Sequence, residues 1–439
     1  MNIQNNLQKK TFSDFDKLNL KSFAENLLQN IEKGIESPIE EQEGSYTVSL
    51  NAAFGNGKTT FLEMFQSFME DKKKYNVISI NAWTSDFYVH PIISILYEWL
   101  EFIESQKMEK KAKKEFINKI KKKIINVAHQ FFRNKTGLDI KEVWNDTNTV
   151  KNETILDTLK QIKSAVKELK AIIQKYTEDK KLLIIVDELD RARPDYAVHF
   201  LEDMKHFFDV KNIIFLVAVN RNQMENTVKC LYGQNLNFNG YYRKFFKQEI
   251  ELPDPYQEAQ NFVDNLIKKT KVNFHFQTSK KEYTLDNVYY SCKMFNLTLR
   301  EVEQFMRIFD AVLGHDTAGL SLTYMDCYSF FICFSIKQKN IFKQILNKQF
   351  SIDSFLNYVK ELSLPEDPKH YLRYLLKHVA YSFLTKKTKP SYIEKIFNIL
   401  LPHPENLHFL RYENLTLSET QPAFIICEKI NQCKSHFSR

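Results

Sequence analysis

The stretch YTVSLNAAFGNGKTT, residues 46–60, decides how this chain folds. It begins as a short apolar strand, continues through a loop of small residues, and ends where Lys58 and Thr59 open a helix with an apolar stripe. Gly55 and Gly57 let the backbone turn so that successive N–H groups point inward, and the amino end of the helix adds its dipole to the same concavity. The spacing therefore predicts a loop that binds the phosphates of a nucleotide.

The residues of this loop have separate expected roles. The Lys58 ammonium can reach the terminal phosphates, and the Thr59 hydroxyl is placed to ligate Mg²⁺. One position departs from the G-x-x-x-x-G-K-[ST] spacing, because its first glycine falls on Ala52, which tolerates a positive φ poorly. The alternative interpretation is a glycine-containing turn of some other doubly wound domain. The residues of the loop expected to contact the nucleotide are Gly55, Asn56, Gly57, Lys58, Thr59 and Thr60.

A second stretch, KLLIIVDELDR at residues 181–191, places two acids at the end of an apolar run. Five consecutive apolar residues predict a strand buried on both faces, and ligands of open parallel sheets bind at the carboxyl ends of the strands. Asp187 is therefore expected to hold Mg²⁺ through water, and Glu188 to orient and polarise the attacking water. The alternative is a strand that ends in two solvated acids.

A further buried strand, IIFLVAV at residues 213–219, ends in Asn220. An asparagine side chain at that edge can hydrogen-bond the γ-phosphate or the attacking water, and it can equally turn the chain. Later in the chain, Thr298 and Glu301 form a T-x-x-E capping box, which places Arg300 in the first turn of a helix and off its apolar stripe. Arg300 is either a residue that reaches the nucleotide or an ordinary surface arginine.

Composition excludes several classes of protein. The 439 residues carry a formal net charge of +8, from 62 Lys and Arg against 54 Asp and Glu, which is too mild an excess to require a nucleic-acid partner. The six cysteines form no C-x-x-C pair, so neither a disulfide framework nor a zinc module is indicated. The first residues lack an apolar core and no run approaches ~18 apolar residues. We therefore expect a cytoplasmic protein with no membrane segment.

The chain divides by pattern into three expected parts. Residues 1–255 form an α/β core, with a helical insertion at about 100–178; residues 256–315 form a helical lid; residues 316–439 form a C-terminal helical domain. The insertion begins with a lysine-rich stretch at residues 108–132, which is either an arm for nucleic acid or a solvated helix face, and the glutamates that interrupt it favour the second interpretation.

Several motifs together resemble the KAP family of P-loop NTPases, a group related to the STAND and AAA-like ATPases. They are GNGKTT, the INAW after the second strand, VDELDR, FLVAVN, the GYYRKFF and ELPDP region, and TLREVEQFM. The resemblance covers about residues 10–310. It implies a parallel sheet flanked by helices, ATP with Mg²⁺ as ligands, and hydrolysis with Glu188 as base. It also suggests that Arg300 is a second sensor, and that Arg243 or Arg191 acts on phosphate within or between subunits. The same resemblance implies that Phe54, the aromatic residue before the loop glycine, joins the residues that contact the nucleotide. Many members of the family carry membrane helices in the insertion, whereas this chain has the lysine-rich stretch there.

Three hypotheses about function follow. The first is an ATPase that couples hydrolysis to the assembly or activation of a partner in bacterial anti-phage defence, since bacterial members are often encoded beside nucleases or other effectors. Such a protein is expected to form homo-oligomers and to act on a separately encoded effector. The second is a nucleotide-gated scaffold with little turnover. The third is an ATPase stimulated by nucleic acid through the lysine-rich stretch.

Overall fold

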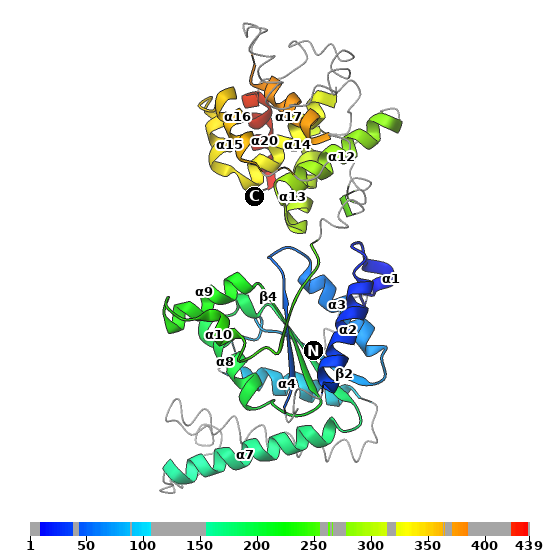
Figure 1. Cartoon of the computed structure of the whole chain (residues 1–439), viewed down its shortest axis with the longest axis vertical. Helices are drawn as coiled ribbons and strands as arrows, with labels where there is room; N and C mark the ends of the chain where they lie inside the picture. Colours follow the sequence, from blue (N-terminus) through cyan, green and yellow to red (C-terminus); the bar gives the residue numbers. More distant parts are fainter. Residues whose placement is uncertain are drawn as a thin grey trace. The chain divides into compact units, whose positions relative to one another are not determined.

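The computed structural model describes residues 9–37, 44–87, 90–106, 155–254, 262–263, 266, 278–313, 322–362, 364, 371–384 and 423–437. The chain forms two compact units, Met1–Pro253 and Asp254–Arg439 (Figure 1). The lysine-rich stretch at residues 108–132 lies outside the described residues, and so do the boundaries expected near residues 255 and 315. The three-part division stays a prediction.

A parallel sheet forms the centre of the first unit. Its order is β2-β3-β4-β1-β5 within the described residues, and each neighbouring pair is parallel. The expected strands are confirmed: β4 coincides with its apolar run, and the bounds of the others differ from the expected segments by one or two residues. They are β1 (Tyr46–Asn51), β2 (Tyr75–Asn81), β3 (Lys181–Asp187), β4 (Ile213–Val219) and β5 (Gln248–Glu251).

Both faces of the sheet are covered by helices, which explains the unbroken apolar runs of β3 and β4 (Figure 1). One face packs against α2 (Lys21–Glu36) and α3 (Lys58–Glu70), and the short α1 (Phe12–Phe15) adds Phe12. The other face packs against α4 (Pro91–Ser105), α7 (Ile155–Tyr176), α8 (Pro194–His206), α9 (Arg221–Tyr232) and α10 (Phe238–Tyr242). Successive strand residues alternate between the two cores, as the period of a strand requires.

The register of the strands brings their polar ends together. Asn81 of β2 is paired with Asp187 of β3, and Asn51 of β1 is paired with Val219 of β4. Because all of these strands point the same way, the loop after β1 and the acids after β3 meet at the carboxyl ends of the strands.

The second unit is helical where the structure describes it. Helix α14 (Leu322–Lys337) packs against α12 (Thr278–Met294), α13 (Leu299–Leu313), α15 (Lys339–Leu346), α17 (Tyr371–Ser382) and α20 (Ala423–Phe437), while α16 (Ile352–Glu361) packs against α17. The expected capping box is confirmed: Thr298 N–H donates to Glu301 Oε2 at 2.8 Å, and Glu301 N–H donates to Thr298 Oγ1 at 3.3 Å.

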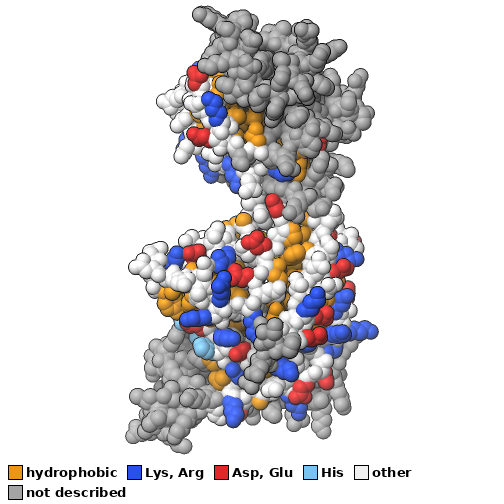
Figure 2. Space-filling model, viewed as in Figure 1, with side chains coloured by type: hydrophobic (Ala, Val, Ile, Leu, Met, Phe, Trp, Pro, Cys, Tyr) orange, Lys and Arg blue, Asp and Glu red, His pale blue; other side chains and the backbone are white. Residues whose placement is uncertain are grey.

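Within the described ranges, no helix has the length and apolar character needed to cross a membrane. On the face that Figure 2 shows, acidic and basic side chains of the first unit are interspersed, in keeping with the mild net charge.

Candidate functional site

The loop between β1 and α3 has the conformation that its glycines allow. Gly55 and Gly57 both have φ of 84°, and Gly57 is the residue that precedes α3. Ala52, where the usual spacing has a glycine, continues the parallel ladder instead: its N–H donates to the carbonyl of Val219 at 3.1 Å, and its φ is not positive. Alanine is therefore tolerated at this position, because the loop turns only after it.

Lys58 is the first residue of α3 and is 9% exposed. Its ammonium donates to the carbonyl oxygens of Ala52 at 2.6 Å and Ala53 at 3.3 Å, so it lies across the loop that precedes it. Burial lowers the pKa of Lys58, and the carboxylates of Asp190 and Asp187 oppose that shift. The ammonium of Lys58 is thus held by the carbonyl groups of the loop, close to the carboxylates of Asp187 and Asp190.

Thr59 and Asp187 bring the two sequence motifs into direct contact. The Thr59 hydroxyl donates to Asp187 Oδ2 at 2.6 Å, and the N–H of Glu188 donates to Asp187 Oδ1 at 2.8 Å. Burial raises the pKa of Asp187, while these two hydrogen bonds lower it. A hydroxyl and a carboxylate oxygen at hydrogen-bond distance are ligand types that suit Mg²⁺.

Glu188 leaves β3 in a left-handed conformation, with φ of 57°, and precedes the short 3₁₀ helix η1 (Leu189–Arg191). Its carboxylate has two donors: Arg191 Nη1 at 2.7 Å and Asn81 Nδ2 at 3.2 Å. A non-glycine residue with positive φ stores strain of order 1 kcal/mol, and such residues gather at functional sites. The carboxylate is held at a definite place beside the phosphate loop.

Phe54 connects the loop to the acidic motif. Its ring centroid is 5.4 Å from Lys58 Nζ and 5.2 Å from the guanidinium carbon of Arg191. Two cations thus contact one aromatic side chain, whose ring is 36% exposed. The structure thus brings together Phe54, Lys58, Thr59, Asp187, Glu188 and Arg191.

Two residues of this site were missed in the sequence. Asn81 belongs to the INAW motif, but no role was predicted for it. The signal that indicates it is its place at the carboxyl end of β2, directly beside Asp187 at the end of β3. Asp190 is 3% exposed and accepts the N–H of Asn220 at 3.0 Å, and burial raises its pKa. Its sequence spacing gave no sign that it would be buried near Lys58.

The remaining predicted residues lie in different places. Asn220 caps α9, with Oδ1 accepting from Gln223 N–H at 3.3 Å, which fits the turn interpretation; its sensor role stays a prediction. Arg243 is exposed after α10 and lines a cavity of about 670 Å³ beside β5 with Arg221, Asn239, Phe246, Lys247 and Glu249. Arg300 is an exposed residue of α13 in the second unit. Thr60 lies in the first turn of α3, as expected.

One observation indicates that the loop is built for a polar ligand. The side-chain oxygen of Asn56 is buried and has no hydrogen-bond partner among the described residues. Buried polar atoms in native proteins are normally paired, so this one indicates a group that arrives with the ligand. Because an amide oxygen only accepts, its partner must be a hydrogen-bond donor or a cation and not a phosphate oxygen. The oxygens of Thr59 and Asp187 are the groups here that suit the Mg²⁺ of a nucleoside triphosphate.

The fold and the site define a P-loop NTPase, an enzyme that binds and hydrolyses nucleoside triphosphates. The sequence profile of the KAP family P-loop domain matches residues 21–313. That is more than half of the chain, and the chain therefore belongs to the KAP family. The resemblance seen in the sequence is confirmed, and the protein is an ATPase by class.

Several solved structures match most of the chain at low sequence identity and with TM-scores below 0.5. The ORC2 protein of Aeropyrum pernix, in ADPNP and ADP complexes, has 12% identity and a TM-score of 0.33, and the match covers 96% of this chain and 95% of that one. Cdc6p of Pyrobaculum aerophilum has 12% identity and a TM-score of 0.39 with the same coverage. The replication initiator DnaA, bound to AMPPCP and single-stranded DNA, has 11% identity, a TM-score of 0.28, and coverage of 88% and 86%. No curated protein matches the chain.

Proposed function

We propose that Mg·ATP binds where Lys58, Thr59, Asp187 and Glu188 converge, and that its hydrolysis changes the assembly or activity of a partner protein in bacterial anti-phage defence. The observation that carries this proposal is the 2.6 Å hydrogen bond between Thr59 and Asp187, because it joins the phosphate loop to the acidic strand end.

Each side chain has a role that its surroundings support. The ammonium of Lys58 neutralises charge on the terminal phosphates, and the loop N–H groups hold the same oxygens. Thr59 and Asp187 would hold Mg²⁺, which supplies charge neutralisation and positioning when it is bound. Glu188 orients water and accepts its proton, with Asn81 and Arg191 fixing the direction of the carboxylate.

Coupling to a partner is supported by the other contact of Asn81. Besides donating to Glu188, its side chain accepts the N–H of Thr84 at 3.0 Å. Thr84 belongs to the loop after β2, in which Trp83 is 51% exposed. A protein that binds this loop would therefore act two hydrogen bonds away from the catalytic base.

The test measures Mg·ATP turnover and molecular mass, with and without ATP, for the wild type, Lys58→Ala and Glu188→Gln. The proposal expects turnover in the wild type alone and ATP-dependent association in the wild type and Glu188→Gln. Association that needs ATP without any turnover would favour the scaffold instead. Lack of response to Mg·ATP would refute both.

The role in defence is tested separately. The chain is expressed with its neighbouring genes, and the efficiency of phage plating is measured. The wild type is expected to lower plating, and Lys58→Ala is expected to lose that effect. Equal plating with both would remove the defence role while leaving the ATPase in place.

A further inference from the structure

Among the described strands, β2 forms one edge of the sheet and lacks the usual protection of an edge. It is seven residues long, YNVISIN, with no proline, glycine or charged residue. The opposite edge, β5, is four residues long, contains Glu249 and Glu251, and is followed closely by Pro253. Charged residues, proline and short length protect an edge strand from pairing with another chain. Strand β5 has these features, and β2 does not.

The pairing pattern shows which groups of β2 face outward. Lys181 N–H donates to Lys74 O, and Ala82 N–H donates to Asp187 O, so the even-numbered residues of β2 bond to β3. The backbone groups of the odd-numbered residues Tyr75, Val77, Ser79 and Asn81 therefore point away from β3. Two of these groups are already bonded: Tyr75 N–H donates to Lys72 O at 3.0 Å, and Asn81 O accepts from Ser85 N–H at 3.1 Å. In the described part of the chain, no strand pairs with this edge.

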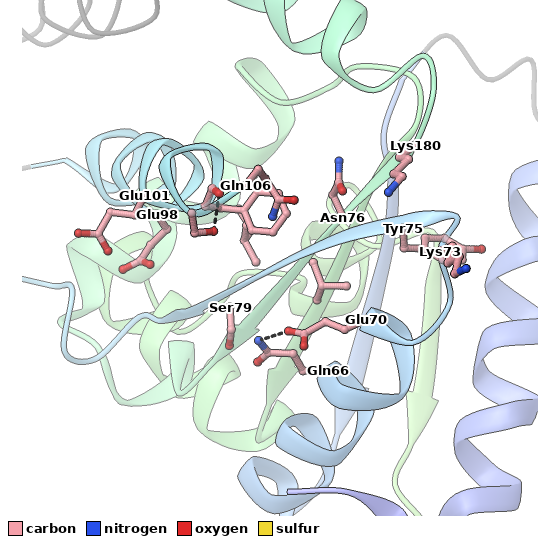
Figure 3. A pocket seen from close by; sticks show the side chains of 14 residues that line it. Gln66, Glu70, Lys73, Tyr75, Asn76, Ser79, Glu98, Glu101, Gln106 and Lys180 are labelled. Carbon is pink, nitrogen blue, oxygen red and sulfur yellow. Dashed lines mark hydrogen bonds between the residues drawn. The ribbon is translucent and has the colours of Figure 1, made fainter. Parts of the chain in front are cut away.

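A cavity of about 650 Å³ runs along this edge between α3 and α4 (Figure 3). Ser79 is exposed at its floor, and helices supply the walls. The space beside the strand is thus not filled by side chains of the described first unit, which leaves room for another chain.

Charges of opposite sign lie toward the two ends of this cavity. Glu98 and Glu101 of α4 lie toward the Ser79 end, and Lys73 and Lys180 lie toward the Tyr75 end (Figure 3). No ion pair within the described residues neutralises any of these four side chains. Burial raises the pKa of Glu98, and the proximity of Glu101 adds to this shift. Glu70 also lines the cavity, and its carboxylate pairs with Lys9 at 2.6 Å. The other four charges give the edge an acidic end and a basic end.

We propose that β2 pairs with β2 of a second copy of this chain, antiparallel and about a twofold axis near Val77. An isologous interface must be self-complementary, and antiparallel pairing brings the acidic end of one edge to the basic end of the other. Val77 then exchanges two backbone hydrogen bonds with Val77 of the second copy, and Ser79 N–H donates to the Tyr75 carbonyl of that copy, so that the sheet continues across the dimer.

The competing occupants fit the charge pattern less well. The chain's own stretch after Gln106 is rich in lysine, which suits only the acidic end, and lysine, alanine and glutamate are depleted in strands. A foreign strand would need opposite charges at its two ends, which a second copy supplies without any further assumption.

The experiment measures the mass of the full chain, without nucleotide, by light scattering across a concentration series. The wild type is expected to reach twice the 52.2 kDa of one chain. Ser79→Pro removes an outward N–H without breaking a bond to β3, and should weaken dimerisation tenfold or more. The matched control, Ser79→Ala, keeps the backbone donor and should dimerise like the wild type.

Charge exchange provides a sharper test. One variant carries Glu98→Lys with Glu101→Lys, and a second carries Lys73→Glu with Lys180→Glu. Each variant alone meets like charge at both contacts and should be monomeric, whereas a mixture of the two should form the heterodimer. Failure of the mixture to associate would overturn the antiparallel arrangement.

Hydrogen exchange at the amides of Val77, Ser79 and Asn81 identifies other occupants. Protection that rises with protein concentration supports the dimer. A monomer with protected amides would show that the chain covers its own edge, and a monomer with unprotected amides would show an unused edge; both results overturn the inference. The inference adds a site of self-association to the proposed function, and ATP turnover measured on the same samples shows separately whether that function fails.

Discussion

Replacement of Glu188 by glutamine removes the proposed catalytic base with little change of shape. Loss of a general base lowers turnover by about 10²- to 10⁴-fold, which is roughly 3–5 kcal/mol of transition-state stabilisation. Glu188 makes no hydrogen bond to Lys58 or Thr59, since its carboxylate contacts Asn81 and Arg191. We therefore expect kcat to fall by this factor while the Kd for Mg·ATP changes less than about threefold.

The structure also limits the expected loss of stability. Both partners of Glu188 are donors, so the amide nitrogen of glutamine cannot replace one of the two accepting oxygens. The side chains of Glu188 and Arg191 are 16% and 29% exposed, and loss of such a partly exposed pair costs about 1 kcal/mol. For a unit of this size, that lowers Tm by about 2–4 °C. The variant should remain folded at the temperature of the assay.

The assay compares steady-state ATP turnover, calorimetric nucleotide binding and thermal unfolding. Glu225→Gln on α9 is the matched control, because Glu225 also pairs with a cation, Lys229, at 2.6 Å and is partly exposed. The control should turn over like the wild type. Turnover by Glu188→Gln at the wild-type rate would refute the role of Glu188 as base. A large fall of Tm, or loss of nucleotide binding, would show that Glu188 stabilises the fold or the nucleotide site and does not act as the base.

Three further results are expected. Asp187→Asn should abolish Mg²⁺-dependent turnover yet raise Tm at pH 8. Burial raises the pKa of Asp187, so its ionised form destabilises the fold by about 1.4 kcal/mol for each pKa unit of the shift. The gain in Tm of the variant should therefore shrink as the pH falls through the folded pKa toward about 4. Gly57→Ala should lower the free energy of unfolding in urea by about 1–2 kcal/mol, because the backbone φ of Gly57 is 84°. Gly233→Ala is the comparison: its φ is 91°, it lies outside the site, and the variant should retain nucleotide binding. Thr298→Ala should destabilise the second unit by about 1 kcal/mol, measured by hydrogen exchange in α13, whereas the exposed Thr84→Ala should leave that helix unchanged.

Periodicity and spacing were sufficient to predict the central fold. The apolar run at residues 213–219 became β4 without a shift of boundary, and residues 182–186 became β3 with one residue added at each end. Such runs are buried on both faces of a parallel sheet, and few other structures bury every side chain of a short segment. Gly55 and Gly57 were equally informative, because a positive φ at both positions leaves few alternatives.

Tertiary structure decided which polar residues share the site. Asn81 is 107 residues before Glu188 in the chain, and only the pairing of β2 with β3 brings its amide to that carboxylate. Asp190 is only three residues after the end of a buried strand, and it is the 3₁₀ helix after β3 that turns its side chain inward to the N–H of Asn220.

The sequence by itself determined the phosphate loop, the strands and the family, because these depend on local backbone geometry and on the burial of contiguous apolar residues. Only the folded chain decided the strand order, and with it the open edge at β2 and the meeting of residues distant in sequence. Long-range pairing is set by how the strands pack together, and no local pattern of residues encodes it.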